Sequence, residues 1–375
     1  MKANSLESVH DLILKASLAS RRDSIARRKT KDLRKPAAAW VTETRIGEAT
    51  GKALSIVFAT IGCSHARGEL GGCTMCSYLL DGTEKPPTDE QITTQFNQAM
   101  TRLADASGPL AVKIYTSGSF LDPSEVSLDA RSRIVQMISE DNRIAEVVIE
   151  SRPEYVTNEV MDELRRSLGD RTIEIGIGLE SSNDAIRQMC VNKGFDISDF
   201  KNAIEITRDH QIGVRAYVLL KPPFLSEQNA LQDTIRTISD CNLMGVSTVS
   251  VNPVNVQKHT LVEELWSKGE YRPPWLWSLL EVLKKGRSIL DSRINLICDP
   301  VAAGKARGVH NCGKCDKVIV DAIRSFSFSQ DPTRLEGFQC ECLSQWKHIL
   351  EHGNTSLLVY SDRRVIESKR LKAEH

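Results

Sequence analysis

The stretch Thr172–Glu180 reads TIEIGIGLE and alternates strictly between apolar residues and glycines or polar residues. A period of two predicts a strand whose successive side chains point to opposite faces. The isoleucines and the leucine need a cover of helices, so Glu174, Gly176, Gly178 and Glu180 are expected to face the interior of a curved sheet. Two glycines in that row remove side-chain volume, which predicts room for a ligand or, alternatively, a local bulge.

The same rhythm extends outward from this stretch in both directions. Short β-branched runs alternate with amphipathic segments, which is typical of βα units and a parallel sheet. We predict six strands in all, at 53–61, 110–117, 145–151, 172–180, 212–220 and 246–254. The sequence therefore predicts an α/β fold, a partial (β/α)6 barrel.

The rhythm changes at both ends of this barrel, which predicts three regions. Residues 1–51 form a basic N-terminal helical extension, 52–256 the barrel, and 257–375 a C-terminal extension. The last region has a Trp- and Pro-containing segment, then an expected helix at 279–290, an expected strand at 293–298 and a cysteine-rich tail.

Composition excludes few functions. The 375 residues are 41% hydrophobic and 26% charged, as in ordinary globular proteins, and 49 basic residues balance 49 acidic ones. A local excess lies between Lys15 and Lys35, where nine basic residues stand against two acidic ones. This segment is either a solvated helix face or a contact for RNA phosphates. No signal peptide or membrane segment is predicted, so we expect a cytoplasmic protein whose ten cysteines are ligands or buried thiols.

Three of these cysteines follow the first predicted parallel strand. Cys63, Cys73 and Cys76 have the spacing C-x9-C-x2-C. Three thiolates suit three irons of a cubane [4Fe–4S] cluster and leave the fourth iron for a small molecule. A zinc ion would need a fourth ligand such as His65. Parallel barrels build their active sites in the loops at this end of the strands, which favours the cluster.

The tail has a second cysteine pattern. Cys312 and Cys315 are followed after 24 residues by Cys340 and Cys342. Two short pairs of this kind predict a structural zinc site, with Cys298 or His310 as alternate ligands. Buried thiols or a second cluster are the alternatives.

The cluster loop and the order of parts over 52–256 resemble the radical S-adenosylmethionine (SAM) superfamily, in the branch with a widened first cysteine gap, as in the Elongator catalytic subunit. The resemblance implies a radical SAM barrel with a [4Fe–4S] cluster and SAM. Most members have an aromatic residue before the last cysteine, where this sequence has Met75. The implied cofactor contacts are Met75, Ser117, Gly118, Ser119, Glu150, Arg152, Glu180, Lys221 and Asn252.

Three motifs narrow the resemblance: GGCTMCSY at 71–78, YTSGSFLDP at 115–123 and HNCGKCD at 310–316. Together they resemble the archaeosine-forming radical SAM enzymes, the RaSEA family. That resemblance implies a lyase that acts on lysine-modified 7-deazaguanine in tRNA and cleaves the C–N bond of the lysine side chain. Its implied partners are tRNA, a lysine-transferring archaeosine synthase and a low-potential electron donor such as ferredoxin or flavodoxin. Two alternatives are action on another RNA base or a small metabolite, and a non-catalytic zinc protein that binds RNA.

Overall fold

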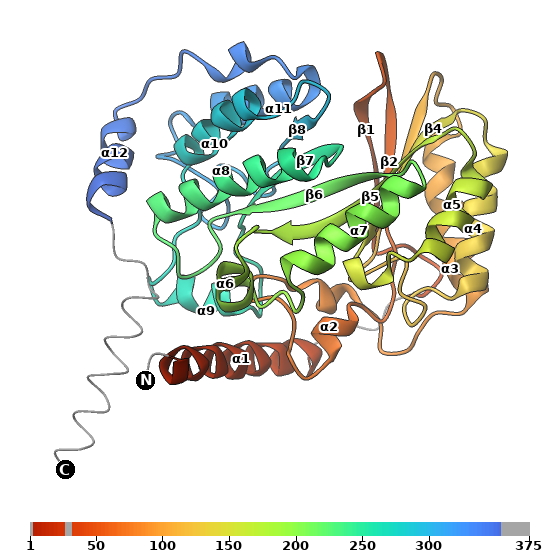
Figure 1. Cartoon of the computed structure of the whole chain (residues 1–375), viewed down its shortest axis with the longest axis horizontal. Coiled ribbons are helices and arrows are strands. Elements are labelled where there is room, and N and C mark those ends of the chain that lie inside the picture. The colour runs from red at the N-terminus through yellow and green to blue at the C-terminus, as the bar shows by residue number, and fades with distance from the viewer. Residues whose placement is uncertain (1–2, 27–31, 354–375) are drawn as a thin grey trace.

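A curled sheet of eight strands forms the centre of the molecule (Figure 1), in a computed structural model that describes residues 3–26 and 32–353. The strands follow one another in sequence order across the sheet. They are β1 (Ala38–Ile46), β2 (Ala49–Val57), β3 (Leu110–Tyr115), β4 (Ile144–Ser151), β5 (Thr172–Glu180), β6 (Gly213–Leu220), β7 (Thr248–Pro253) and β8 (Asn295–Ile297).

The six predicted parallel strands are confirmed as β2 to β7, and the strand expected at 293–298 joins them in parallel as β8. One expectation for residues 1–51 was incomplete. Only α1 (Ala3–Ala26) is helical among the described residues there, and β1 pairs antiparallel with β2 as a hairpin at the edge of the sheet. Most β1 side chains are exposed or half-buried, so β1 lacks the apolar alternation that marks the buried strands.

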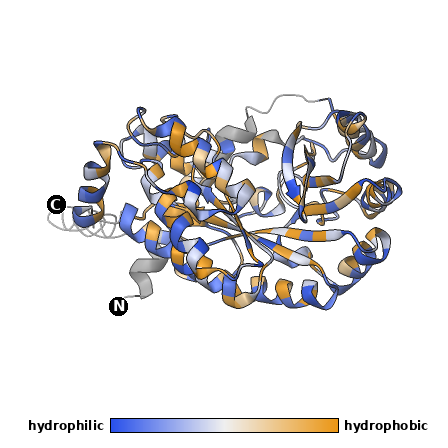
Figure 2. Cartoon of the chain, turned by 90° about the horizontal axis from the view of Figure 1, so that it is seen from above, coloured by the Kyte–Doolittle hydropathy of each residue, from blue (hydrophilic) through white to orange (hydrophobic). Residues whose placement is uncertain are grey.

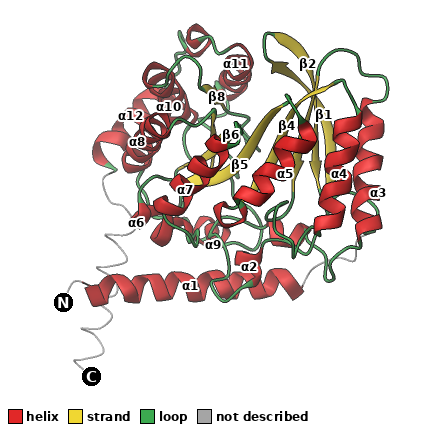
Figure 3. Ribbon diagram, turned by 45° about the vertical axis from the view of Figure 1, so that its right-hand side comes forward, coloured by secondary structure: helices red, strands yellow, loops and turns green. Residues whose placement is uncertain are grey.

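Helices cover the outer face of the sheet (Figure 3). Many begin at a side chain that accepts a hydrogen bond from the first turn, as Thr88, Thr157 and Ser226 do. The longer ones are α3 (Asp89–Met100), α4 (Leu128–Glu140), α5 (Asn158–Leu168), α7 (Ile197–Asp209), α8 (Glu227–Met244), α10 (Leu276–Ile289), α11 (Asp316–Ser329) and α12 (Cys342–His352). The short ones are α2 (Ser64–Arg67), α6 (Asp184–Ile186) and α9 (Leu261–Ser267).

The main core lies between the sheet and these helices, where Figure 2 shows the hydrophobic residues gathered. Ile173, Ile175, Ile177 and Leu179 of β5 are buried in it. Their alternation therefore reports the outer face, as predicted from TIEIGIGLE. The polar residues of β5 face the lumen.

The lumen near the amino ends of the strands holds a charge network. Arg215 on β6 contacts Glu174 on β5 at 2.5 Å and Glu146 on β4 at 3.6 Å. The Thr248 hydroxyl donates to Glu174 over 2.6 Å. Arg215 and Glu174 are each less than a tenth exposed. This network closes the lower lumen with charged groups where many barrels pack aliphatic side chains.

The glycines of β5 make room for the protein's own side chains. A Cβ placed on Gly176 would lie 2.8 Å from the Tyr217 hydroxyl, and one on Gly178 would lie 2.4 Å from Lys193 Nζ. The space that the sequence predicted for a ligand therefore holds Tyr217 and Lys193 at these two positions. The bulge alternative also occurs, because the register with β6 shifts between Gly178 and Glu180.

Helix α1 lies across the carboxyl end of the barrel, below α2, α6 and α9 in Figure 1. Ile13 packs beside Leu261 of α9. Leu18 lies over Gly71, where an added Cβ would come within 2.8 Å of the leucine side chain. The helix therefore covers part of the cysteine loop. Among the described residues, no helix is both long enough and apolar enough to cross a membrane.

Replacing Arg215 with Leu is expected to destabilise the fold by about 3–5 kcal/mol, because it leaves the Glu174 carboxylate buried without its cation. Urea denaturation measures the change. The double variant Arg215→Leu/Glu174→Leu should recover part of the loss. Lys317→Ala is the control, since it removes an exposed ion pair with Asp321 and should change stability by less than about 1 kcal/mol. Equal stability of wild type and Arg215→Leu would contradict a structural role for the network.

Candidate active site at the carboxyl ends of the strands

The three predicted cluster cysteines lie on the loop that follows β2. None forms a disulfide, and all three are half-buried. The Cys63 amide donates to the Ser117 carbonyl over 3.1 Å, and the Cys76 amide donates to the Cys73 carbonyl over 3.2 Å. Burial raises the pKa of the Cys63 thiol, the Arg152 cation opposes the rise, and the charge of Cys73 adds to it. Cys63, Cys73 and Arg152 are therefore electrostatic neighbours.

This loop fits a cluster better than a single ion. Within the described part of the protein, the one group of ligand atoms found within 4.8 Å of one another is in the tail. A cubane holds its thiolates further apart than one zinc ion does, because its irons lie between them. His65, the ligand that the zinc alternative needed, has its Nε2 hydrogen bonded to the Asn192 carbonyl at 2.7 Å.

The turn Ser117-Gly118-Ser119 after β3 packs directly on Cys63. A Cβ placed on Gly118 would lie 2.4 Å from Cys63 Cα and 2.0 Å from Glu125 Oε1. The predicted close approach of the backbone at this glycine is therefore confirmed, and the neighbour that requires it is the cysteine itself. That the turn also binds the amino group of SAM remains a prediction.

Glu125 was missed by the sequence analysis. Its carboxyl accepts hydrogen bonds from the Ser119 amide at 2.8 Å and from the Thr60 hydroxyl at 2.8 Å. Burial raises its pKa to about 7, against the lowering effect of these two donors. Glu125 joins the segment before Cys63 to the turn after β3. A lone glutamate three residues past Asp122 gives no sequence signal for that role.

Glu150, Arg152 and Glu180 come together at the rim, as predicted. Lys193, which the sequence analysis missed, lies among them: its Nζ bonds Glu180 Oε1 at 2.7 Å, and its carbonyl accepts from Arg152 at 3.1 Å. Arg152 also pairs with Glu154. Burial raises the pKa of the Glu150 carboxyl to about 8, Lys193 opposes the rise, and Glu180 and Glu125 add to it.

Three other predicted contacts lie elsewhere on the rim. Lys221 is buried, and its Nζ pairs with Glu227 Oε2 at 2.7 Å. Asn252 is half-buried on β7, 3.4 Å from the Ser250 hydroxyl. Met75 packs against a small apolar cluster that includes Val191, Val256 and Val262. The structure therefore does not group these three with Glu150 and Lys193.

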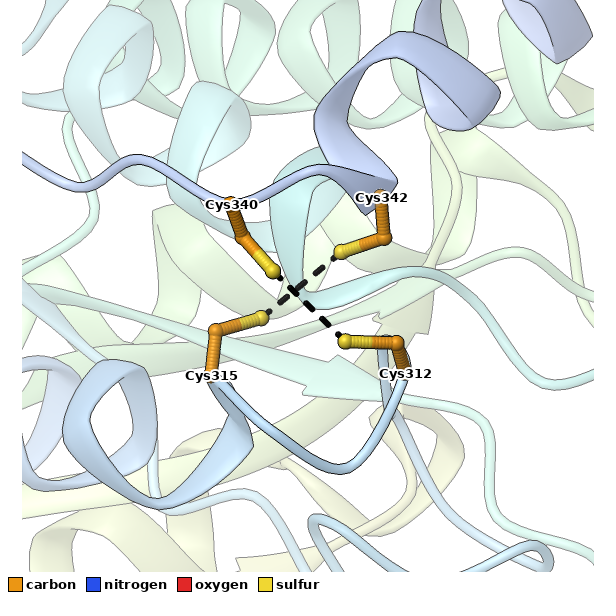
Figure 4. Close-up of side chains that lie close together, drawn as sticks. All are labelled: Cys312, Cys315, Cys340 and Cys342. Carbon is orange, nitrogen blue, oxygen red and sulfur yellow. Dashed lines mark hydrogen bonds between the residues drawn. The ribbon is translucent and has the colours of Figure 1, made fainter.

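The four tail cysteines converge from two segments (Figure 4). The Sγ atoms of Cys312 and Cys340 lie 3.6 Å apart, and those of Cys315 and Cys342 lie 3.8 Å apart. Tetrahedral zinc with Zn–S bonds of about 2.3 Å holds its sulfurs ~3.8 Å apart. The cysteines thus have the spacing of a closed four-thiolate site.

Polar groups around this site orient the sulfurs. Trp277 Nε1 lies 3.3 Å from Cys342 Sγ, and Asn311 Nδ2 lies 3.3 Å from Cys315 Sγ. Such donors commonly fix ligand orientation around a metal. The alternates lie outside the four-cysteine group: Cys298 is buried beside Ser327, and His310 Nδ1 bonds the Gly308 carbonyl.

Two relatives of the protein share one name. An archaeosine synthase subunit beta from Methanosarcina acetivorans is 43% identical over 84% of this chain and 90% of its own length. Another, from Thermococcus kodakarensis, is 40% identical over 84% of this chain and 96% of its own length. The protein belongs to the archaeosine synthase beta-subunit family. The resemblance seen in the three motifs is thereby confirmed.

Other comparisons are more distant from the beta-subunit family. An archaeal Elp3 structure from Methanocaldococcus infernus, with an N-terminal deletion, matches 59% of this chain and 54% of its own, with a TM-score of 0.46 and 17% identity. No protein-family model matches the sequence.

The Glu150→Gln variant should become increasingly more stable than wild type as pH rises from about 4.5 to about 8. The carboxyl pKa is raised on folding, so the folded state holds this proton more tightly and wild type loses stability as pH rises through that window. Thermal unfolding of both proteins at pH 5, 6, 7 and 8 measures the difference. A stability difference that is constant across the series would contradict the raised pKa.

Proposed function

We propose that this protein is the radical SAM subunit of archaeosine formation. It would act on tRNA whose 7-deazaguanine bears a lysine attached by a partner archaeosine synthase, and as a lyase it would cleave the C–N bond of that lysine side chain. The observation that carries this proposal is three free, half-buried thiols on the loop after the first parallel strand, in a member of the archaeosine synthase beta-subunit family. The relatives' name supports both the tRNA product and the presence of a second subunit.

Cys63, Cys73 and Cys76 would hold the [4Fe–4S] cluster, and the turn at Gly118 would face the SAM bound to it. When bound, the cluster and SAM together supply a 5′-deoxyadenosyl radical that abstracts hydrogen from an unactivated carbon. The protein's own task is then orientation and exclusion of side reactions.

The rim residues offer complementary charges for amino-acid groups. No described side chain donates a hydrogen bond to the Glu150 carboxyl, so it is open to an ammonium group of a ligand. Lys193 and Arg152 supply positive charge beside it for a carboxylate. These groups would hold the methionine part of SAM or the lysine of the substrate, so that one carbon beside the C–N bond meets the radical.

The RNA would contact the basic N-terminal segment. Lys15, Arg34 and Lys35 are exposed, and α1 lies at the mouth of the barrel. The basic residues at 27–31 lie outside the described residues. A low-potential donor such as ferredoxin or flavodoxin would deliver the electron.

The four tail cysteines would bind structural zinc. Four thiolates complete a tetrahedral shell, so such a site leaves no position for a substrate. The metal would join the loop before α11 to the start of α12, because Cys312 and Cys315 belong to the first and Cys340 and Cys342 to the second.

Anaerobic reconstitution tests the function directly. The wild-type protein should bind about four irons per cluster and cleave SAM reductively. With its partner synthase and lysine-modified tRNA it should form archaeosine, detected by nucleoside mass spectrometry. Cys63→Ala should lose both iron and SAM cleavage, because a three-thiolate site has no spare ligand. Cys241→Ala, which removes a buried thiol from α8, is the matched control and should keep both activities.

Two outcomes would contradict parts of this proposal. Full iron content in Cys63→Ala would exclude the cluster assignment. SAM cleavage with no change in the modified tRNA, in the presence of the partner, would move the reaction to another RNA base or a small metabolite.

Zinc should be present at one ion per protein molecule after purification without chelators. Cys312→Ala should lower zinc content and thermal stability together, because metal binding contributes to folding here. The absorption of the reconstituted cluster should stay unchanged. Elemental analysis that finds no zinc in the wild-type protein would exclude this role.

A further inference from the structure

The cysteine loop is anchored by a short segment that follows β5 and α6. A single π-helical turn (Arg187–Val191) ends there, and residues 190–194 lie against the loop. The Thr74 amide donates to the Val191 carbonyl at 2.9 Å, and the Thr74 hydroxyl donates to the Cys190 carbonyl at 2.7 Å. Contact between these two segments therefore runs along the loop between its first and last cysteines.

Asn192 makes the central contacts. Its side-chain amide donates to the Leu70 carbonyl at 2.7 Å and to the Gly72 carbonyl at 2.8 Å, and its own carbonyl receives His65 Nε2 at 2.7 Å. The residue is 3% exposed. One side chain and one carbonyl thus bind both ends of the stretch that separates Cys63 from Cys73.

That stretch needs an external anchor for a physical reason. It spans nine residues, of which only Ser64–Arg67 form a helix, and the entropy lost on fixing a loop grows with its length. It ends in two glycines with left-handed backbones, Gly71 at φ 68° and Gly72 at φ 77°, which place little restraint on an unanchored loop. The Asn192 amide holds the carbonyls on either side of Gly71.

We infer that Asn192 is a positioning residue for the three-cysteine centre, whose amide fixes the distance from Cys63 to Cys73. The inference rests on the proposed function in one respect, which is that these cysteines hold a cluster. The next residue, Lys193, bonds Glu180 and receives Arg152, so the same short segment joins the cluster loop to the charged rim.

A simpler role for Asn192 is its backbone. It has φ 56°, and asparagine tolerates the left-handed region better than most residues. The two roles separate experimentally. Asn192→Gly keeps the backbone conformation and removes both donors. Asn192→Asp keeps the side-chain shape but places a carboxylate against two carbonyl oxygens.

The test compares wild type, these two variants and the surface control Asn202→Asp after anaerobic reconstitution. Iron per protein molecule, the rate of iron release to a chelator, and the electron paramagnetic resonance spectrum of the reduced protein are measured, alongside zinc content and thermal unfolding. Both Asn192 variants should release iron about tenfold faster or more, since two buried hydrogen bonds are lost. Their spectra should change, while zinc content stays at the wild-type level.

Wild-type iron release and an unchanged spectrum in Asn192→Gly would show that only the backbone matters and would overturn the inference. Loss of zinc together with iron in both variants would overturn it as well, because it would indicate general unfolding. Full iron content in Cys63→Ala would instead refute the proposed cluster, whatever the Asn192 variants do. The two failures are therefore distinguishable.

Discussion

The hydrogen bond from the Cys63 amide to the Ser117 carbonyl is the contact on which the rest of the site depends. Strands β2 and β3 run parallel with Val57 opposite Tyr115, so the backbone leaves both strands at the same edge. The two outgoing segments meet at once, and Gly118 allows their backbones to touch. The sheet register therefore determines where the first cysteine lies. The loop and its two further cysteines are then placed from that point by the anchor at residues 190–194.

Charge pairing divides the lumen into a structural part and a part available for ligands. Arg215 neutralises Glu174 and approaches Glu146, and Lys221 neutralises Glu227. Glu150 has no such partner at hydrogen-bonding distance among the described residues, and its pKa rises to about 8 because burial disfavours the charged carboxylate. A ligand ammonium would favour the ionised form and would lower that pKa. The carboxyl left unpaired is therefore the one that gains most from a cationic ligand.

Local patterns in the sequence predicted much of this architecture, and long-range contacts account for what they did not predict. Alternation in Thr172–Glu180 predicted the strand and its two faces, and cysteine spacing predicted the four-thiol group of the tail. The edge strand β1 lacks a buried face, so periodicity did not mark it. Asn192 acts on carbonyls about 120 positions earlier in the sequence. The order Asn-Lys-Gly is a signal for a tight turn, but a turn signal does not name the carbonyls that its side chain binds.

The two sulfur sites have opposite geometries that match opposite requirements. In the tail, four thiols approach to 3.6 and 3.8 Å across the site, two of them are buried, and nearby side chains donate to their sulfurs. Such a shell is complete and excludes further ligands. At the barrel mouth three thiols are half-buried on one loop, and the charged rim lies beside them. A centre that must bind a small molecule needs this incomplete shell, and an incomplete shell cannot fix its own loop by metal bonds alone. The anchoring has to come from the protein, which is why the bonds from Asn192 and Thr74 converge on the loop that has the fewer thiols.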